Sequence, residues 1–194
     1  MAEPRKPLRE RKQRRARDAI VEAALDLFAE RGFDDVTVSD IAERAEVGRS
    51  TFFRYFGDKQ EVVFAGDYGV ADAAKMIGPD WPPLGDSLPA ALAATRAIVV
   101  AYLRVLTAQP RHYTLHEELV EKHPELYARS LVKQRRLAES MVEQLIGLGA
   151  GRQTAELAAE LGLACFYAGR AAAGNDPSRL TDAVDAAFDR LMAR

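Results

Sequence analysis

Residues 37–61, TVSDIAERAEVGRSTFFRYFGDKQE, decide the fold and indicate the function. The segment from Val38 to Glu46 places its apolar residues on one face at the 3.6-residue period of an α-helix. Val47 and Gly48 interrupt this helix, and a second short helix is predicted from Arg49 to Phe56. Two short helices joined by a tight turn form a helix-turn-helix.

The second short helix has the side chains that a DNA-reading helix needs. It begins with one long cation and two hydroxyls, Arg49, Ser50 and Thr51. An arginine can bind guanine O6 and N7 together, and Ser or Thr can bond to base edges or phosphates. Donors suited to phosphate oxygens follow, at Arg54, Tyr55 and Lys59. Because similar short helices occur in other all-helical domains, a purely structural role stays open.

A basic segment precedes this motif. Residues 1–17 carry eight positive and two negative side chains, a net charge of +6, whereas residues 18–194 carry a net charge of −8. Apolar residues at helical spacing then predict a first helix over about 10–31, which ends at Gly32. The basic segment is either a phosphate-binding arm or a solubilising tail.

Helices are also predicted for the rest of the chain. Asp58 and Glu61 have the spacing of a capping box before a helix from Lys59 to about Met76. Residues 78–86, GPDWPPLGD, indicate a linker, and helices are predicted over 88–108, 111–122, 124–148, 152–173 and from 177 onward. The sequence therefore predicts an all-α protein of about nine helices. We divide it into a basic arm (1–14), a helix-turn-helix domain (15–60) and a larger helical domain (61–194).

Composition excludes several classes of protein. Hydrophobic residues make up 48% and charged residues 29% of the 194, so a disordered chain is not expected. The longest stretches without a charged side chain are nine residues, too short for a membrane span, and the basic N-terminus lacks the apolar region of a secretory signal. One cysteine, Cys165, allows no internal disulfide. We expect a soluble cytoplasmic protein with no membrane partner.

Residues 15–64 resemble the N-terminal domain of the TetR family of bacterial transcriptional regulators. The resemblance is carried by AALDLFAERGFDDVTVSDIAERAEV and GRSTFFRYFGDKQEVV. It implies a homodimer that binds a palindromic operator in double-stranded DNA and a larger domain that binds a small-molecule effector. It also implies DNA contacts for Thr37, Ser39, Arg49, Ser50, Thr51, Phe53, Tyr55 and Lys59. Phe53 stands where such proteins usually have tyrosine, so a phenolic donor to phosphate is lost there.

On the family resemblance, the larger domain would enclose an effector pocket. Candidate lining residues are Tyr102, Leu106, Tyr113, His116, Leu119, Leu126, Tyr127, Leu137, Met141, Phe166 and Tyr167. Such a lining suits a largely apolar effector held by a few hydrogen bonds, although these residues could equally be ordinary core. The segment ELYARSLVKQRRLAESMVEQL has some resemblance to acyl-CoA-responsive members. There, Arg129, Lys133, Arg135 and Arg136 would meet an anionic head group, or else form a solvated helix face.

The last two predicted helices are candidates for the dimer interface. Their apolar faces consist of Ala158, Leu161, Cys165, Ala168 and Ala172, and of Leu180, Val184, Phe188 and Leu191. In the family that the chain resembles, the equivalent helices form a four-helix bundle across a two-fold axis. The alternative is that the two helices pair within one protomer.

No cofactor, metal or catalytic residue is predicted. His112 and His116 are four residues apart and could face one metal ion, but no third ligand is fixed. Motifs for a nucleophilic serine, a phosphate loop or a zinc protease are absent, and the apolar surroundings of Cys165 favour an inert thiol. We therefore predict a ligand-responsive repressor. The alternatives are a regulator that activates transcription, a helical enzyme, and an interaction protein whose arm binds RNA or membrane.

Overall fold

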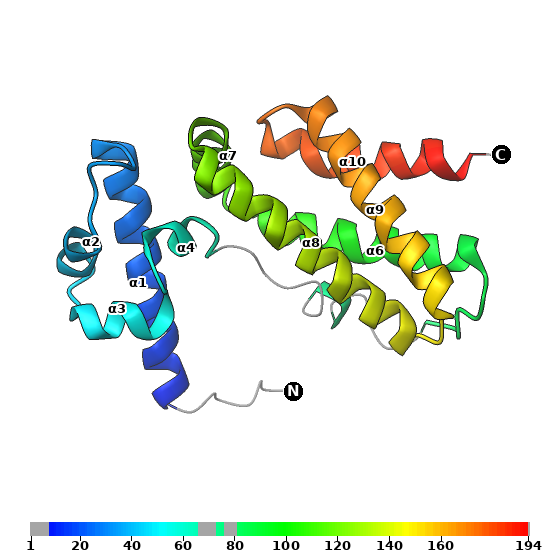
Figure 1. The fold of residues 1–194 in the computed structure, drawn as a ribbon, viewed down its shortest axis with the longest axis horizontal. Helices are drawn as coiled ribbons and strands as arrows, with labels where there is room; N and C mark the ends of the chain where they lie inside the picture. The colour runs from blue at the N-terminus through cyan, green and yellow to red at the C-terminus, as the bar shows by residue number, and fades with distance from the viewer. Residues whose placement is uncertain (1–7, 66–72, 76–80, 194) are drawn as a thin grey trace, which may run out of the picture. The chain divides into compact units, whose positions relative to one another are not determined.

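The computed structural model describes residues 8–65, 73–75 and 81–193, and it describes residues 8–11 by their backbone alone. The chain forms two compact units, residues 1–66 and 67–194, and each is considered by itself. Both are helical, with nine labelled helices in the described residues (Figure 1). The described residues contain no strand, only an isolated β-bridge between Gly85 and Ala150.

The N-terminal unit, hereafter the DNA-binding unit after the role that the sequence predicts for it, contains four helices around a small core. They are α1 (Leu8–Arg31), α2 (Val38–Arg44), α3 (Arg49–Tyr55) and α4 (Lys59–Val63). The long α1 packs against each of the other three. Ile20 of α1, Ile41 of α2 and Phe52 of α3 are fully buried, so each helix contributes a large apolar side chain to the same core.

The turn between α2 and α3 lies where the sequence predicts it, and Glu46 sets its geometry. Glu46, not Gly48, has the left-handed conformation, with φ of 54°. Its N–H donates to the Glu43 carbonyl, and the Val47 N–H donates to the Ala42 carbonyl, which together form a Schellman motif. Gly48 has ordinary extended angles as the N-cap of α3. The turn therefore does not require glycine at position 48. Its strained, left-handed position is occupied by Glu46, which is not a glycine.

The C-terminal unit, hereafter the body, is built around α9. Its helices are α6 (Leu88–Leu106), α7 (Pro110–Lys122), α8 (Pro124–Gly147), α9 (Arg152–Ala173) and α10 (Pro177–Met192). Every body helix except α9 has a proline in its first turn. The missing N–H of proline costs nothing at that position, because an N–H there would have no partner within the helix. Helix α9 packs against α10, α6 and α8. Its bounds, like those of the other body helices, lie within two residues of the predicted ones.

Two glycines allow α9 to approach its neighbours closely. A Cβ atom at Gly169 would lie 2.4 Å from Val184 Cγ2 of α10, and one at Gly162 would lie 2.5 Å from Thr95 Cγ2 of α6. Any larger residue would clash, so these two positions fix the spacing between the helices. The bidentate ion pair of Arg96 with Asp185, at 2.6 and 2.7 Å, joins α6 to α10 beside them.

The described part of the predicted linker belongs to the body. Leu84 is buried, and its N–H donates to the Leu148 carbonyl at 3.0 Å. The bridge between Gly85 and Ala150 lies next to it, so residues 81–86 pack on the turn between α8 and α9. Helix α4 ends at Val63, earlier than the helix predicted to Met76. Residues 66–72 and 76–80 lie outside the described residues.

Helix α6 alone among the described helices has the length and apolar composition to cross a membrane. The same helix supplies Ala91, Ala94, Ile98 and Leu103 to the buried core of the body, and Arg96 pairs with Asp185. These features are typical of the core helix of a globular domain, so length and composition are weak evidence for a span.

Candidate functional site

The short helix α3 is held from behind by one aromatic side chain. Phe52 is fully buried, and its ring centroid lies 5.8 Å from that of Phe56. This anchor leaves Arg49 and Ser50 exposed at the start of the helix and Thr51 partly exposed. The three predicted base-reading residues therefore lie on accessible positions of α3, with a cation and hydroxyls that can bond to base edges.

Phe53 is the large apolar residue that α3 exposes. Half of its surface is accessible, and its ring meets that of Phe52 edge-on with centroids 5.5 Å apart. The Arg49 guanidinium lies 6.0 Å from the centroid of the Phe53 ring. An exposed ring beside a cation on this helix can contact a thymine methyl while the arginine reaches a base or phosphate.

Thr37 begins α2 through a capping box. Its hydroxyl accepts from the Asp40 N–H at 3.2 Å, and the Asp40 carboxylate accepts from the Thr37 N–H at 2.8 Å. The hydrogen bonds from Thr37 hold the pKa of Asp40 at about 2, below the ordinary 3.8. The Thr37 hydroxyl therefore has a structural partner. Ser39 is exposed on the first turn of the same helix.

The Lys59 ammonium has a different role from the predicted phosphate contact. It donates to the carbonyls of Phe33 at 2.7 Å, Asp34 at 3.2 Å and Val36 at 2.9 Å. An ammonium has three protons, so these three acceptors use all its donors. Lys59 thus fastens α4 to the loop between α1 and α2, and it would have to leave that loop to bind phosphate.

Tyr55 also departs from its predicted role. Its hydroxyl oxygen is buried and has no hydrogen-bond partner in the described residues. The Arg54 guanidinium covers the ring, 5.1 Å from its centroid. A phosphate contact through this hydroxyl would therefore require the side chain to move, whereas Arg54 is exposed.

The predicted basic arm is helical from Leu8 onward, because α1 begins there. Lys12, Arg14 and Arg15 are exposed along it, and residues 1–7 lie outside the described residues. Arg17 has a partner within the unit: its guanidinium donates to the Ala65 carbonyl at 2.7 Å and lies 5.4 Å from the centroid of the Phe56 ring. The first cations of α1 are thus available to phosphates, while Arg17 ties the end of α4 to α1.

The candidate effector residues of the body divide into buried and exposed groups. Tyr102, Tyr113, Leu119, Leu126 and Met141 are buried, and Leu106, His116, Leu137 and Phe166 are partly buried. Tyr127 and Tyr167 are 52% and 40% exposed, and the Tyr167 hydroxyl donates to Gln134 at 2.6 Å. These two tyrosines therefore lie on the outer surface and do not line an enclosed pocket.

A buried ion pair joins α7 to α9. Oε2 of Glu117, whose side chain is 6% exposed, lies 2.6 Å from Nη2 of Arg170. Nδ1 of His116 lies 3.1 Å from the other carboxylate oxygen. Burial and the Glu117 charge raise the pKa of Tyr113, one turn earlier on α7. Sequence reasoning missed Glu117 and Arg170; the spacing of Tyr113 and Glu117 on one helix face was the signal.

Most residues assigned to the dimer interface lie inside one protomer. Ala158, Cys165, Leu180, Val184 and Phe188 are buried in the core between α9 and α10. They cannot form a surface between subunits, because their apolar contacts are already made within the chain. Burial also raises the pKa of the Cys165 thiol, in agreement with an inert cysteine. Leu161 is half-buried, and Ala168 and Leu191 are exposed.

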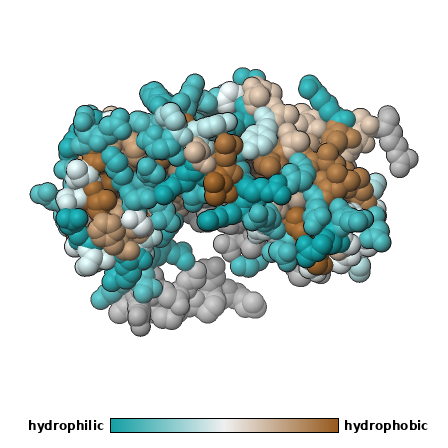
Figure 2. Space-filling model, viewed as in Figure 1, coloured by the Kyte–Doolittle hydropathy of each residue, from teal (hydrophilic) through white to brown (hydrophobic). Residues whose placement is uncertain are grey.

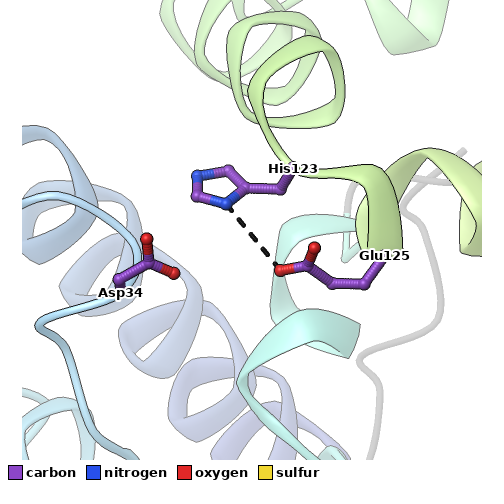
Figure 3. A group of neighbouring side chains, drawn as sticks. All are labelled: Asp34, His123 and Glu125. Carbon is purple, nitrogen blue, oxygen red and sulfur yellow. Dashed lines mark ion pairs between the residues drawn. The ribbon is translucent and has the colours of Figure 1, made fainter.

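Two histidines of the body, His116 and His123, have carboxylate neighbours. His116 bonds to Glu117, and Nδ1 of His123 lies 3.7 Å from Glu125 Oε1 at the start of α8 (Figure 3). Asp34, drawn in the same figure, belongs to the DNA-binding unit, and the body contributes only the His123–Glu125 pair. Two ligands do not define a metal centre.

The cationic face of α8 is used in surface ion pairs. Arg135 pairs with Glu160 of α9 and lies 3.9 Å from Glu139 one turn later on α8. All three side chains are largely exposed. This arrangement is typical of a solvated helix face, which was the alternative to an anionic head-group site.

The chain was compared with known proteins. Residues 20–65 match the family model described as bacterial regulatory proteins, tetR family. The chain is 33% identical over 153 residues to the HTH-type transcriptional regulator TcmR of Streptomyces glaucescens, which covers 77% of this chain and 66% of TcmR. It is 32% identical over 152 residues to the HTH-type transcriptional regulator YdeS of Bacillus subtilis, which covers 75% of this chain and 72% of YdeS.

The fold has a counterpart among solved structures. A TetR transcriptional regulator from Nitrosomonas europaea superposes with a TM-score of 0.53 at 19% identity, over 90% of this chain and 96% of the other. The all-α fold, the accessible recognition helix and the length of the match to YdeS lead to one assignment. The chain belongs to the TetR family of DNA-binding transcriptional regulators, which are not enzymes.

Proposed function

We propose that this regulator is a cytoplasmic homodimeric repressor that leaves its operator when a largely apolar effector binds the body. The observation that carries the proposal is the arrangement of α3, which buries Phe52 and presents Arg49, Ser50 and Phe53 to solvent. In a dimer, two such helices about 34–36 Å apart enter successive major grooves of a palindrome. Exposed cations of α1 add contacts to phosphate.

The outer flank of α9 supports the dimer. Leu157 and Leu161 are followed at helical spacing by Ala164 and Ala168, and Leu157 is 49% exposed. Ala183, Ala187 and Leu191 of α10 continue this apolar flank, and hydrophobic residues gather on the visible face beside the C-terminus (Figure 2). Small residues allow close approach of two helices, so the flank suits a two-fold bundle. The flank keeps Leu161, Ala168 and Leu191 of the interface predicted from the sequence and leaves out its buried residues.

Helix α4 is the element through which release would act. Lys59 fixes its start to the loop before α2, and Arg17 fixes the carbonyl of Ala65 just beyond its end. A displacement of α4 would therefore carry α1 and the recognition helix with it. For this to lower operator affinity, the effector must bind the released state more tightly than the DNA-bound state.

The DNA-binding part of the proposal is tested with operators enriched from random duplexes. We expect the enriched sites to be palindromic, and Arg49→Ala to lower affinity by about 1–3 kcal/mol and relax preference at one base pair. Arg152→Ala, which changes an exposed arginine of the body, is the matched control. Fluorescence anisotropy measures both. Unchanged sequence preference in Arg49→Ala would place the reading helix elsewhere.

The dimer is tested with Ala168→Asp, which adds a charge at an exposed position of the proposed flank. The variant should keep its helical circular dichroism, sediment as a monomer and lose operator binding. Ala128→Asp, at an exposed position of α8, is the control and should stay dimeric. A reporter gene with the operator at its promoter then separates repression from activation.

A further inference from the structure

Tyr113 is a buried residue whose polar atom has no partner in the described residues. Its side chain is 3% exposed, and its hydroxyl makes no hydrogen bond to any described residue. Buried hydroxyls are almost always hydrogen-bonded, so this one indicates a partner other than the described residues. Burial and the charge of Glu117 raise its pKa, which keeps the phenol neutral and able to donate.

The charges around this hydroxyl already balance each other. Glu117 and Arg170 form an ion pair of 2.6 Å, and the Glu117 side chain is almost fully buried. An anionic ligand would compete with Glu117 for Arg170 and place two negative charges together. A cationic ligand would compete with Arg170 in the same way. An anion that displaced Glu117 would leave a buried carboxylate without its partner, which is strongly unfavourable, and a cation that displaced Arg170 would break the same short ion pair.

The buried cluster to which Tyr113 belongs is made of hydrophobic residues. Tyr113 belongs to the same buried cluster as Tyr102, Leu103, Met141 and Leu145. We infer that Tyr113, beside the Glu117–Arg170 pair, anchors an uncharged hydroxyl or carbonyl oxygen of an otherwise apolar effector. The inference rests on the proposed function only in assuming that the body binds an effector. It selects a neutral ligand over acyl-CoA and over cationic drugs.

The test uses probes that differ in one group. Binding of 2-naphthol, naphthalene, 2-naphthoate, 2-naphthylmethylammonium and palmitoyl-CoA to the full-length protein is measured by calorimetry near neutral pH. We expect 2-naphthol to bind most tightly and Tyr113→Phe to weaken it about fivefold to tenfold, while naphthalene is unaffected. Tyr127→Phe, which removes an exposed hydroxyl from α8, is the control and should change nothing.

A second measurement needs no ligand. Because the Tyr113 hydroxyl lacks an internal partner, Tyr113→Phe should melt at the same temperature as the wild type or higher. A lower melting temperature would reveal an internal partner and overturn the inference. So would tighter binding of 2-naphthoate or palmitoyl-CoA, equal binding of naphthalene, no binding of any probe, or an unchanged 2-naphthol affinity in Tyr113→Phe. Operator binding, measured separately, decides the proposed function and is independent of these outcomes.

Discussion

The DNA-binding unit and the body are stabilised in different ways. In the DNA-binding unit, these polar side chains bond to backbone atoms: Thr37 and Asp40 cap α2, Asp58 caps α4, and Lys59 donates to carbonyls of the loop between α1 and α2. In the body, polar side chains join helices far apart in sequence, as Arg96 does with Asp185 and Arg170 with Glu117. A small unit with few buried side chains depends on its helix ends, whereas a larger one can depend on contacts between helices.

The largest expected effect tests whether the two units unfold separately. Phe52 and Phe188 are fully buried, one in each unit, so truncation of either to alanine should cost about 3–5 kcal/mol. Phe52→Ala should abolish operator binding and leave most of the helical signal, while Phe188→Ala should remove most of it. Circular dichroism melts with operator binding measure both. Loss of the whole helical signal in Phe52→Ala would mean that the units fold as one.

The next comparison concerns ion pairs. Glu117→Ala leaves Arg170 without its partner, and we expect the body to lose about 3 kcal/mol. Arg44 makes a pair of 2.8 Å with Glu30 in the DNA-binding unit, but both side chains are about half exposed. Water replaces such a partner, so Arg44→Ala should leave the melting temperature nearly unchanged. If chemical denaturation showed the same loss of unfolding free energy in Glu117→Ala and Arg44→Ala, the proposed difference between the two units would be wrong.

Lys59→Met tests whether a cation of the DNA-binding unit acts on the loop or on DNA. Removing three donors from the Phe33, Asp34 and Val36 carbonyls should cost about 1–3 kcal/mol. The slope of log affinity against log salt should stay as in the wild type, because no phosphate contact is lost. Lys12→Met, at an exposed position of α1, is the control and should reduce that slope without destabilisation. A reduced slope in Lys59→Met would restore the phosphate role.

The smallest effect is in the response to acid. The pKa of Asp40 is about 2 in the folded chain against 3.8 ordinarily, so its contribution to stability is complete above 3.8 and is lost as pH falls toward 2. The DNA-binding unit should therefore lose thermal stability between about pH 4 and 2, and it should lose less in Asp40→Asn than in the wild type, as measured by circular dichroism melts. Asp185, whose pKa Arg96 lowers, gives the body a loss of the same sign. An identical pH profile in Asp40→Asn would show that the Asp40 carboxylate does not cause the loss of stability in acid.

The sequence by itself determined where most of the helices lie and which polar residues begin α3. Helical periodicity and the Asp58 cap of α4 act within a few residues, so the pattern of residues contains them. The roles of Arg49, Ser50 and Phe53 in DNA contact remain predictions. The sequence predicts a turn at Val47 and Gly48 without identifying Glu46 as its left-handed residue.

The tertiary structure decided which side chains are available. The sequence predicts that Lys59 binds phosphate. In the structure, its ammonium donates hydrogen bonds to three carbonyls, which lie 23 to 26 residues earlier in the chain. The sequence predicts that Phe188 and Val184 lie in the dimer interface. In the structure both are buried within the protomer, where α10 packs against α9. Glu117 forms an ion pair with Arg170, which lies 53 residues later in the chain. Each depends on how separate helices pack, and helical periodicity shows that a face is apolar without showing which neighbour covers it.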